Sequence, residues 1–298
     1  MSLPKLIVIA GTNASGKSGL GVELAARYGG EIVSADSRQV FTGLDLGSGK
    51  ITPGEMKGVA HHLLDVCAPG DFYSMADFQR QAYAAIDDIL ARGKLPFLVG
   101  GTGLYVSSVA DGYELSDIAP DLSYRDYLET FDTPALYEML RQLDPDTQAD
   151  PKNRNRVMRT LERIHDGDIR ADKKHPRYET LRLGVTWDRE TLKRRIDERM
   201  EMRLAQGMIE EVQGLLDAGV SKAFLVRLGL EYRYITQYLT GEIATKEEMV
   251  DELLKAIKRF AKRQMTWFRR DQAMQWLDMA ADPMAQACEK IDAFLQKE

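Results

Sequence analysis

Residues 5–18 read Lys-Leu-Ile-Val-Ile-Ala-Gly-Thr-Asn-Ala-Ser-Gly-Lys-Ser. The apolar run 6–10 is rich in β-branched residues, which is typical of a buried parallel strand. Residues 11–18 then fit the spacing G-x-x-x-x-G-K-[ST] of a phosphate-binding P-loop. The stretch therefore predicts a strand, a glycine-rich turn and a helix that begins near Lys17.

Each residue type in this turn has a physical role in holding phosphate. Glycines let backbone N–H groups surround phosphate oxygens without a Cβ in the way, and the helix directs its positive end to the same place. Lys17 supplies a mobile positive charge, and Ser18 a hydroxyl ligand for Mg²⁺. Kinases, NTPases and enzymes that handle a diphosphate all share this loop. The candidate phosphate-binding residues are Gly11, Thr12, Asn13, Ala14, Ser15, Gly16, Lys17 and Ser18.

The composition narrows the class of protein. The 298 residues suffice for one large α/β domain or for a core with an added piece. The net charge of −6 requires any nucleic-acid site to be a local basic patch. Cys67 and Cys288 fit no zinc spacing, which favours a reduced, cytoplasmic protein. No apolar run has membrane-spanning length and no signal peptide is present, so we expect no membrane association.

A second candidate site follows the predicted strand 31–34, where residues 34–41 read Ser-Ala-Asp-Ser-Arg-Gln-Val-Phe. A carboxylate at the carboxyl end of a strand beside the P-loop strand lies where open α/β sheets bind ligands. Asp36 is therefore a candidate general base or metal ligand. An aspartate in such a turn is also typical of an Asx turn or a helix cap, and position alone leaves both interpretations open.

The next part of the chain holds a polar loop, a histidine pair and a second glycine turn. Residues 42–58 are expected to form a loop, and for His61-His62 we favour a structural or hydrogen-bonding role over a metal site, since no third ligand has suitable spacing. A helix over 75–92 and a strand over 95–99 follow. The turn Gly100-Gly101-Thr102-Gly103 then lets the backbone approach a ligand and presents Thr102 to it.

Residues 111–180 are polar with short helical patterns, which predicts a helical insertion in the α/β core. Within it Arg156 and Arg159 lie three apart on one helix face, although an isolated basic pair is more often a solvated surface. After a strand over 181–186, Asp188 is expected to cap one long helix that runs to Leu216.

That long helix carries arginines at four-residue spacing on one face, which repel one another unless acids or an anionic ligand lie beside them. An anion-binding face and a salt-bridged helix surface both remain open. The arginines are Arg195, Arg199 and Arg203, and the acids that could pair with them are Asp197, Glu198 and Glu201.

The stretch 254–270 is strongly basic and contains no Asp or Glu. Its apolar residues recur at helical spacing, and aromatic residues stand among the basic ones. Natural surfaces usually mix charge signs, so this band favours a phosphate backbone as partner over a merely solvated helix. The basic residues are Lys255, Lys258, Arg259, Lys262, Arg263, Arg269 and Arg270. One more amphipathic helix is expected over 284–297.

Together these motifs resemble those of the tRNA dimethylallyltransferases, also called tRNA isopentenyltransferases. The resemblance extends over nearly the whole chain and keeps the family's order. It rests on the P-loop at 11–18, Ser-Ala-Asp-Ser-x-Gln-Val at 34–40, Gly-Gly-Thr-Gly-Leu-Tyr at 100–105, the arginine segments at 156–162 and 195–212, and the tail at 261–269.

The resemblance implies transfer of a dimethylallyl group from dimethylallyl diphosphate to N6 of the adenosine 3′ of the tRNA anticodon, position 37. It implies a P-loop NTPase-like parallel sheet flanked by helices: a core of 1–111 and 181–298 with a helical C-terminal region, and a helical insertion of 112–180 that contacts tRNA. The partners would be dimethylallyl diphosphate and the tRNA anticodon stem-loop. A monomer is expected.

The family also implies roles for individual residues. Asp36 would be the general base and Thr102 would orient the reacting groups. Lys17 and Arg199 would stabilise the leaving diphosphate, with Mg²⁺ held at Ser18. The residues that would contact tRNA, including the flipped-out adenine, are Asp36, Ser37, Arg38, Gln39, Asn155, Arg156, Arg159, Arg259, Lys262 and Arg263.

The chain departs from the family's pattern in a few places. Ser18 stands in place of Thr and Phe41 in place of Tyr, and Thr12-Asn13 replace the usual residues after the first glycine. The segment Ile-Gly-Tyr-Lys-Glu becomes Leu-Glu-Tyr-Arg-Tyr at 230–234, so that Glu231 replaces a glycine. The insertion is shorter than in many bacterial members.

Three other functions remain open. An adenylate isopentenyltransferase would share the P-loop and the base but would not need the basic band at 258–270. A P-loop kinase would consume ATP, and a non-catalytic RNA-binding protein would bind tRNA without transfer.

Overall fold

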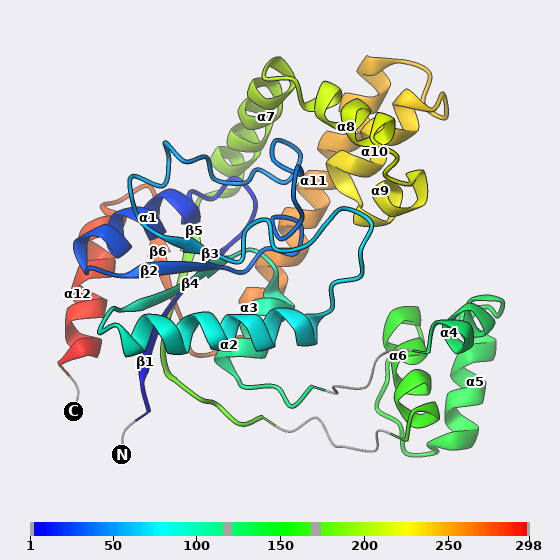
Figure 1. Cartoon of the computed structure of the whole chain (residues 1–298), viewed down its shortest axis with the longest axis horizontal. Helices are drawn as coiled ribbons and strands as arrows, with labels where there is room; N and C mark the ends of the chain where they lie inside the picture. The colour runs from blue at the N-terminus through cyan, green and yellow to red at the C-terminus, as the bar shows by residue number, and fades with distance from the viewer. Residues whose placement is uncertain (1–2, 116–120, 168–173, 297–298) are drawn as a thin grey trace. The chain divides into compact units, whose positions relative to one another are not determined.

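The computed structural model describes residues 3–115, 121–167 and 174–296. The described strands form one six-stranded sheet in the order β3-β2-β4-β1-β5-β6, in which every neighbouring pair is parallel (Figure 1). This confirms the predicted α/β class. The strands are β1 (Lys5–Gly11), β2 (Glu31–Ser34), β3 (His61–His62), β4 (Pro96–Gly100), β5 (Glu179–Thr186) and β6 (Met274–Asp278).

Strand β1 lies between β4 and β5, and its side chains alternate between two buried faces. Leu6 and Val8 pack under α2 (Met75–Ala91) and α3 (Gly103–Ala110). Ile7 and Ile9 pack on the opposite face, under α1 (Lys17–Arg27) and α12 (Pro283–Leu295). A strand buried on both faces reads as a continuous apolar run, which is why residues 6–10 revealed it.

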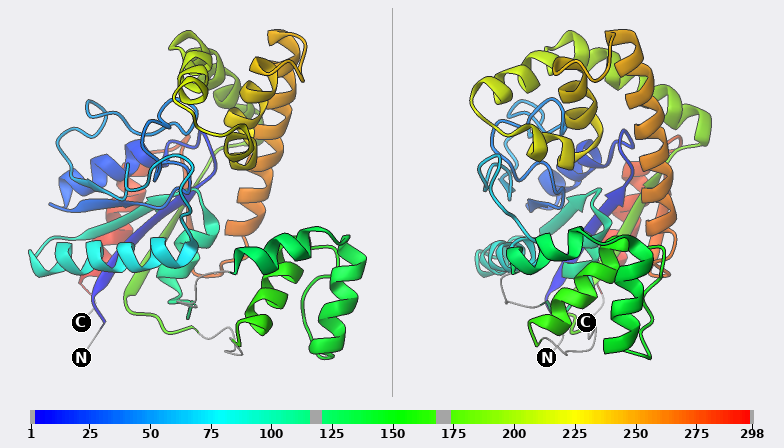
Figure 2. Two further views of the ribbon diagram at one scale, coloured as in Figure 1. Left: turned by 45° about the vertical axis from the view of Figure 1, so that its right-hand side comes forward. Right: turned by 90° about the vertical axis from the view of Figure 1, so that its right-hand side faces the viewer.

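A second core is built by helices that follow β5. The fully buried Tyr232 lies in it. Helix α11 (Lys246–Phe268) extends from this core to the sheet (Figure 2). Its last residue, Phe268, joins the cluster around β1. Distant parts of the chain therefore meet at one end of the sheet. The helices are α7 (Arg189–Ala205), α8 (Met208–Asp217), α9 (Lys222–Leu228), α10 (Leu230–Leu239) and α11 (Lys246–Phe268).

The single helix expected over 188–216 is wrong, because the structure has two helices there. Gly207 separates α7 from α8 with φ 98°, a left-handed conformation that glycine adopts without strain. The break turns the chain so that Met208 and Val212 reach the second core. Asp188 caps α7 as expected, through bonds to the N–H groups of Glu190 and Thr191.

The residues between Tyr113 and His175 form a compact unit of their own, separate from Met1–Gly112 and Pro176–Glu298. Three helices pack around Leu128, Leu140 and Leu161, all of them fully buried. They are α4 (Leu122–Glu129), α5 (Thr133–Leu143) and α6 (Arg154–His165). The prediction of helices at 135–143 and 155–165 agrees with α5 and α6.

Two strands escaped the sequence prediction because little in their sequence marks them. β3 has two residues, and β6 is a short edge strand in which only Met274 and Leu277 are buried. The histidines of β3 make the hydrogen bonds expected of them: His61 Nδ1 lies 2.9 Å from the Val59 carbonyl oxygen, and His62 Nε2 lies 2.7 Å from Glu31. Among the described helices, none is long and apolar enough to span a bilayer.

Gly100 ends β4 where the backbone of Ala35, the residue after β2, comes very close. A Cβ at this position would overlap the backbone carbonyl of Ala35, which is not free to move aside. We expect Gly100→Ala to lower the free energy of unfolding by about 1–3 kcal/mol or more, as overpacking does. Urea denaturation at constant m-value measures this change.

The matched control is Gly214→Ala in α8, where an added Cβ meets no atom within 4 Å. It should leave stability unchanged or raise it by about 0.5–1 kcal/mol, because alanine favours a helix. Equal stability of the two variants would contradict the close approach at Gly100.

Candidate active site

A cavity of about 310 Å³ opens at the carboxyl ends of β1, β2 and β4. It collects residues from segments far apart in the sequence. Its floor comes from the P-loop and the turns after β2 and β4, and its walls from α7, α9, α10 and α11. The described residues that line it include Asn13, Ala14, Lys17, Ser18, Asp36, Ser37, Arg38, Gln39, Gly49, Thr102, Ile196, Arg199, Met200, Arg203, Arg227, Leu228, Glu231, Ile257, Phe260 and Gln264.

The P-loop has the shape that its glycine spacing predicts. Gly16 adopts a left-handed φ of 89° just before α1, and Ala14 is also left-handed, with φ 59°. The Lys17 ammonium donates to the carbonyl of Thr12 at 3.3 Å. The loop thus turns tightly onto the start of α1, and Lys17 and Ser18 line the cavity.

Side chains from distant elements hold this loop in place. Arg195 Nε donates to the Ala14 carbonyl at 2.9 Å, and Trp187 Nε1 donates to the Ser15 carbonyl at 2.9 Å. Gln264 Oε1 accepts the Asn13 N–H at 2.9 Å, while its amide donates to Gly101 at 2.8 Å. Sequence reasoning missed Trp187 and Gln264, because their role exists only through these long-range bonds.

Lys17 lies among charges that oppose one another. The pKa of Lys17 is lowered to about 8, first by loss of hydration and then by the charges of Arg199 and Arg203, while the carboxylate of Asp36 acts in the opposite direction. A lysine in this state gains from a bound anion, which would return its pKa toward the ordinary value.

Asp36 forms the Asx turn that the sequence left open as one interpretation, and it also lies at the cavity, where the other interpretation would require it. Its Oδ1 accepts the N–H of Arg38 at 3.0 Å, which forms an Asx turn, and its carboxylate also lines the cavity. Thr102 fixes the same turn from β4: its Oγ1 accepts the Ser37 N–H at 3.0 Å, and its N–H donates to the Ala35 carbonyl at 3.2 Å. Asp36 is therefore held in one orientation at the cavity floor.

Gln39 is engaged within the fold. It accepts a hydrogen bond from Ser34 Oγ at 3.1 Å and donates to the Gly49 carbonyl at 3.2 Å. Gly49 also accepts a long bond from Arg199 at 3.4 Å. Because φ of Gly49 is 65° and a Cβ there would overlap the guanidinium groups of Arg199 and Arg203, only glycine fits without displacing them.

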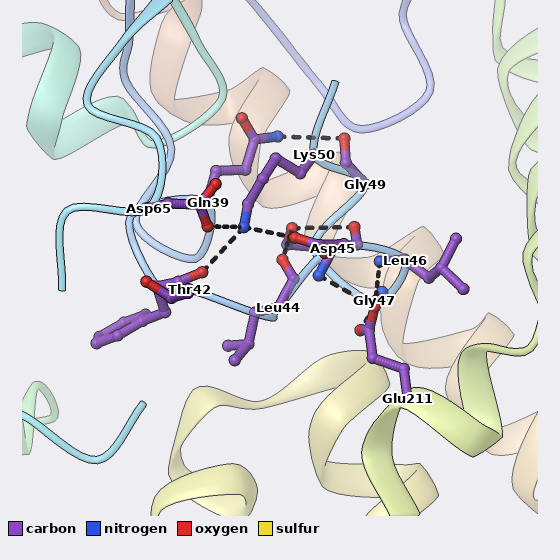
Figure 3. A network of polar contacts seen from close by, with 12 residues as sticks. Gln39, Thr42, Leu44, Asp45, Leu46, Gly47, Gly49, Lys50, Asp65 and Glu211 are labelled. Carbon is purple, nitrogen blue, oxygen red and sulfur yellow. Dashed lines mark hydrogen bonds and ion pairs between the residues drawn. The ribbon is translucent and has the colours of Figure 1, made fainter. Parts of the chain in front are cut away.

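The loop around Gly49 is anchored by a network of polar contacts (Figure 3). Glu211 of α8 accepts the backbone N–H groups of Asp45, Leu46 and Gly47 at 3.1, 2.6 and 3.0 Å, and the Tyr232 hydroxyl at 3.0 Å. This carboxylate fixes the polar loop expected at 42–58 beside the arginines. Glu211 is a second contribution that sequence reasoning missed.

Lys50 secures the other side of that loop. Its ammonium donates to the Phe41 carbonyl at 3.0 Å and to Asp45 at 2.6 Å, and it also pairs with Asp65. Figure 3 shows the ammonium between the two carboxylates. These contacts fix the loop, and its residues Ser48 and Gly49 line the cavity.

The three stacked arginines of α7 serve the site and are not a salt-bridged surface. Arg195 holds the P-loop, whereas Arg199 and Arg203 line the cavity. Burial and then the charge of Arg203 lower the pKa of Arg199 to about 10, while Glu231 and Asp36 raise it. Burial likewise lowers the pKa of Arg203. Such depressed values favour the alternative in which this face binds an anion.

Two of the acids expected to pair with these arginines, Asp197 and Glu198, pair with other residues. Asp197 pairs with Lys258 at 2.6 Å, and Glu198 lies 3.6 Å from Arg194. Arg203 lies 3.7 Å from Glu231 of α10. Glu231 is the acid whose function the sequence alone did not reveal.

Helix α11 divides the basic band into two parts. Lys255 and Lys258 pair with acids on α11 and α7, so these two are balanced within the fold. The side chains of Arg259, Lys262 and Arg263 are exposed. Ile257, Phe260 and Gln264 of the same helix line the cavity. The exposed band thus lies on the helix that forms one cavity wall.

The insertion unit carries the remaining predicted contacts on α6. Asn155 and Arg156 are exposed, and Arg159 pairs with Glu162 at 3.2 Å. Glu162 is buried and lies 3.6 Å from Arg125, so part of the charge of Arg159 serves the unit's own structure.

The donors at the cavity floor suit Mg²⁺ bound together with a diphosphate. Ser18 supplies a hard hydroxyl oxygen, and Mg²⁺ commonly takes few protein ligands plus substrate phosphates and water. In the described part of the chain, no three His, Cys, Asp or Glu side chains gather as a self-sufficient metal site.

A parallel sheet with a P-loop and a cavity rich in positive charge defines a P-loop enzyme for an anionic substrate. The sequence profile of the family described as IPP transferase matches residues 39–271, and that described as isopentenyl transferase matches residues 4–68. The chain belongs to the IPP transferase family, which confirms the resemblance drawn from its motifs.

Named relatives support this assignment. A tRNA dimethylallyltransferase 2 of Shewanella sediminis is 44% identical, with 96% of this chain and 97% of that protein covered. A tRNA dimethylallyltransferase of Geobacillus thermodenitrificans is 40% identical, with 94% and 91% covered. The crystal structure of a tRNA isopentenylpyrophosphate transferase from Bacillus halodurans is 39% identical, with a TM-score of 0.74 and coverage of 98% and 95%.

We expect Gly49→Ala to weaken the binding of inorganic pyrophosphate by about tenfold or more, because the added Cβ displaces Arg199. Gly58→Ala is the control: φ of Gly58 is 79°, so the backbone strain is similar, but no atom lies within 4 Å of the added Cβ. Calorimetric titration compares the two. Equal losses would show that strain, and not the arginines, decides the affinity.

The pKa of Lys17 near 8 predicts a pH dependence of anion binding. Binding favours charged Lys17, and the charged fraction in the free protein falls about tenfold per pH unit above that pKa. Pyrophosphate affinity should therefore begin to fall near pH 8. Lys17→Arg keeps its charge, so its affinity, although lower, should not show this additional fall; parallel curves for the two proteins between pH 7 and 10 would refute the assignment.

Proposed function

We propose that the chain transfers the dimethylallyl group of dimethylallyl diphosphate to N6 of the adenosine 3′ of the tRNA anticodon, giving N6-isopentenyladenosine. The observation that carries the proposal is that one cavity joins a P-loop, a fixed carboxylate and buried arginines. These are the groups that a diphosphate leaving group and a weakly nucleophilic amine require.

The P-loop and α7 would bind the diphosphate, which is the leaving group of the reaction. Lys17, Arg199 and the start of α1 would stabilise the negative charge that grows on the diphosphate as the C1–O bond breaks. Mg²⁺ at Ser18 would neutralise part of that charge when bound. The full P-loop, Gly11 to Ser18, is assigned to diphosphate binding.

The acceptor end falls to Asp36. Adenine N6 is a poor nucleophile, and its attack on C1 becomes favourable when a base removes a proton from the amine. The carboxylate of Asp36 would accept that proton as the N6–C1 bond forms. Thr102 holds the Asp36 turn through Ser37, so its contribution is to keep the base oriented toward the reacting amine.

The apolar part of the cavity wall fits the donor's hydrocarbon group. Ile196 and Met200 of α7 and Ile257 and Phe260 of α11 line the same space as the cationic residues. Such a surface excludes water from a carbon that would otherwise be open to hydrolysis. The donor would thus lie with its anionic end at the P-loop.

The tRNA contacts are assigned to two groups of residues. Ser37, Arg38 and Gln39 lie at the cavity, where an adenine flipped out of the anticodon loop would enter. Phosphate contacts would come from exposed basic and polar side chains on α11 and α6: Arg259, Lys262, Arg263, Asn155, Arg156 and Arg159. The monomeric state stays a prediction from the sequence.

We expect protein incubated with isotope-labelled dimethylallyl diphosphate and unmodified tRNA to yield labelled N6-isopentenyladenosine, detected by mass spectrometry of tRNA digests. Asp36→Asn keeps the oxygen that accepts the Arg38 N–H but loses the base, so transfer should fall by about 10²–10⁴-fold. Affinities for tRNA and pyrophosphate should stay close to those of the unchanged protein.

The acceptor distinguishes the rival functions. Transfer to AMP and not to tRNA would identify an adenylate isopentenyltransferase, and tight ATP binding without binding of dimethylallyl diphosphate would identify a kinase. A native protein that binds tRNA but yields no labelled adenosine would be a non-catalytic RNA-binding protein.

A further inference from the structure

Glu231 is one of two acidic residues among the described residues that line a cavity rich in positive charge. Only 2% of its surface is exposed, and it lines the cavity. Burying a carboxylate costs free energy unless cations or hydrogen-bond donors pair with it, so the partners of Glu231 indicate its role.

Two arginines of the cavity bind this carboxylate, one on each oxygen. Arg38 Nη1 donates to Glu231 Oε2 at 2.9 Å, and Arg203 Nη1 lies 3.7 Å from Oε1. Arg38 also lies over the ring of Phe260, with its guanidinium carbon 5.8 Å from the centroid. The carboxylate thus holds one arginine from the β2 turn and one from α7.

The start of α10 sets this position. Gly229 and Leu230 have positive φ values of 76° and 45°, so the chain turns sharply and places Glu231 in the first turn of the helix. A carboxylate is favoured there by the helix dipole. The acid is therefore placed by the backbone as well as by its two arginines.

The charges of the lining residues nearly match those of a diphosphate. Of the described residues that line the cavity, five are Lys or Arg and two are acids, Asp36 and Glu231, which leaves a formal excess of three positive charges. A diphosphate monoester carries about two to three negative charges near neutral pH. Without Glu231, the cavity would hold one more uncompensated positive charge, and Arg38 and Arg203 would be free to bind an anion.

We propose that Glu231 is a positioning residue that occupies Arg38 and Arg203 and so limits the affinity of the cavity for anions. Its charge lets pyrophosphate leave after transfer and disfavours ligands with a third phosphate. This inference rests on the proposed function, in which pyrophosphate is the product.

The test is calorimetric titration of the protein, in buffer that contains Mg²⁺, with inorganic pyrophosphate and with tripolyphosphate, in the absence of tRNA and prenyl donor. Glu231→Gln removes the charge but keeps a side chain of similar shape. We expect it to bind pyrophosphate at least tenfold more tightly than the unchanged protein, and tripolyphosphate to gain more than pyrophosphate. In multiple turnover, kcat should fall while a first-turnover burst persists.

The control is Glu190→Gln on α7, an exposed acid outside the cavity, which removes the same charge and should leave both affinities unchanged. Glu231→Asp keeps the charge and should retain weak pyrophosphate binding. If Glu231→Gln does not fold, the double variant Glu231→Gln, Arg203→Gln keeps the net charge and should bind pyrophosphate within about threefold of the unchanged protein.

A folded Glu231→Gln that binds pyrophosphate equally or more weakly overturns the inference, because the acid would then serve only to place the arginines. A change of tenfold or more in the double variant overturns it as well. Failure of the unchanged protein to bind pyrophosphate at all would instead contradict the proposed function, so the two failures are distinguishable.

Discussion

Positive charge gathered at the carboxyl end of the sheet, with too few acids to balance it, is the constraint on which the site depends. Lys17, Arg199 and Arg203 all have lowered pKa values, and for each the first cause is loss of hydration. A protein holds such a set only where the rest of the fold fixes it and a ligand relieves it. The site is therefore preorganised for an anion before any substrate arrives.

The rigidity that this requires comes from segments far apart in the sequence. The P-loop is held by Arg195 and Trp187 near the start of α7 and by Gln264 near the end of α11. Glu211 fixes the loop that packs Gly49 against the arginines. The helices after β5 thus complete a site that the first part of the chain begins, and neither part would hold the cavity alone.

The sequence predicted those parts of the fold whose signal is local. The strand before the P-loop, the Asp36 turn and the glycine turn at Thr102 each follow from a few neighbouring residues, and the structure brings all three to one cavity. β6 was missed because an edge strand with two buried side chains has no distinct pattern. The break at Gly207 was missed because a single glycine within a helical pattern does not by itself predict the end of a helix.

The side chains that complete the site could not be predicted from neighbouring residues, for a different reason. Trp187, Gln264 and Glu211 act through bonds to residues more than a hundred positions away, so no spacing in the sequence could reveal them. Asp36 differs from these residues, because the Asx turn that holds its carboxylate at the cavity is a local bond to Arg38.

Glu231 shows why a departure from a family pattern is informative only with its contacts. By resemblance it replaces a glycine, and an acid in the first turn of a helix is favoured even where it is exposed to solvent. In the structure that acid is buried between two arginines of the cavity, where its charge bears on every anion that binds. A substitution at this depth alters the balance of the site itself, because the low local dielectric lets one added charge act on all its neighbours.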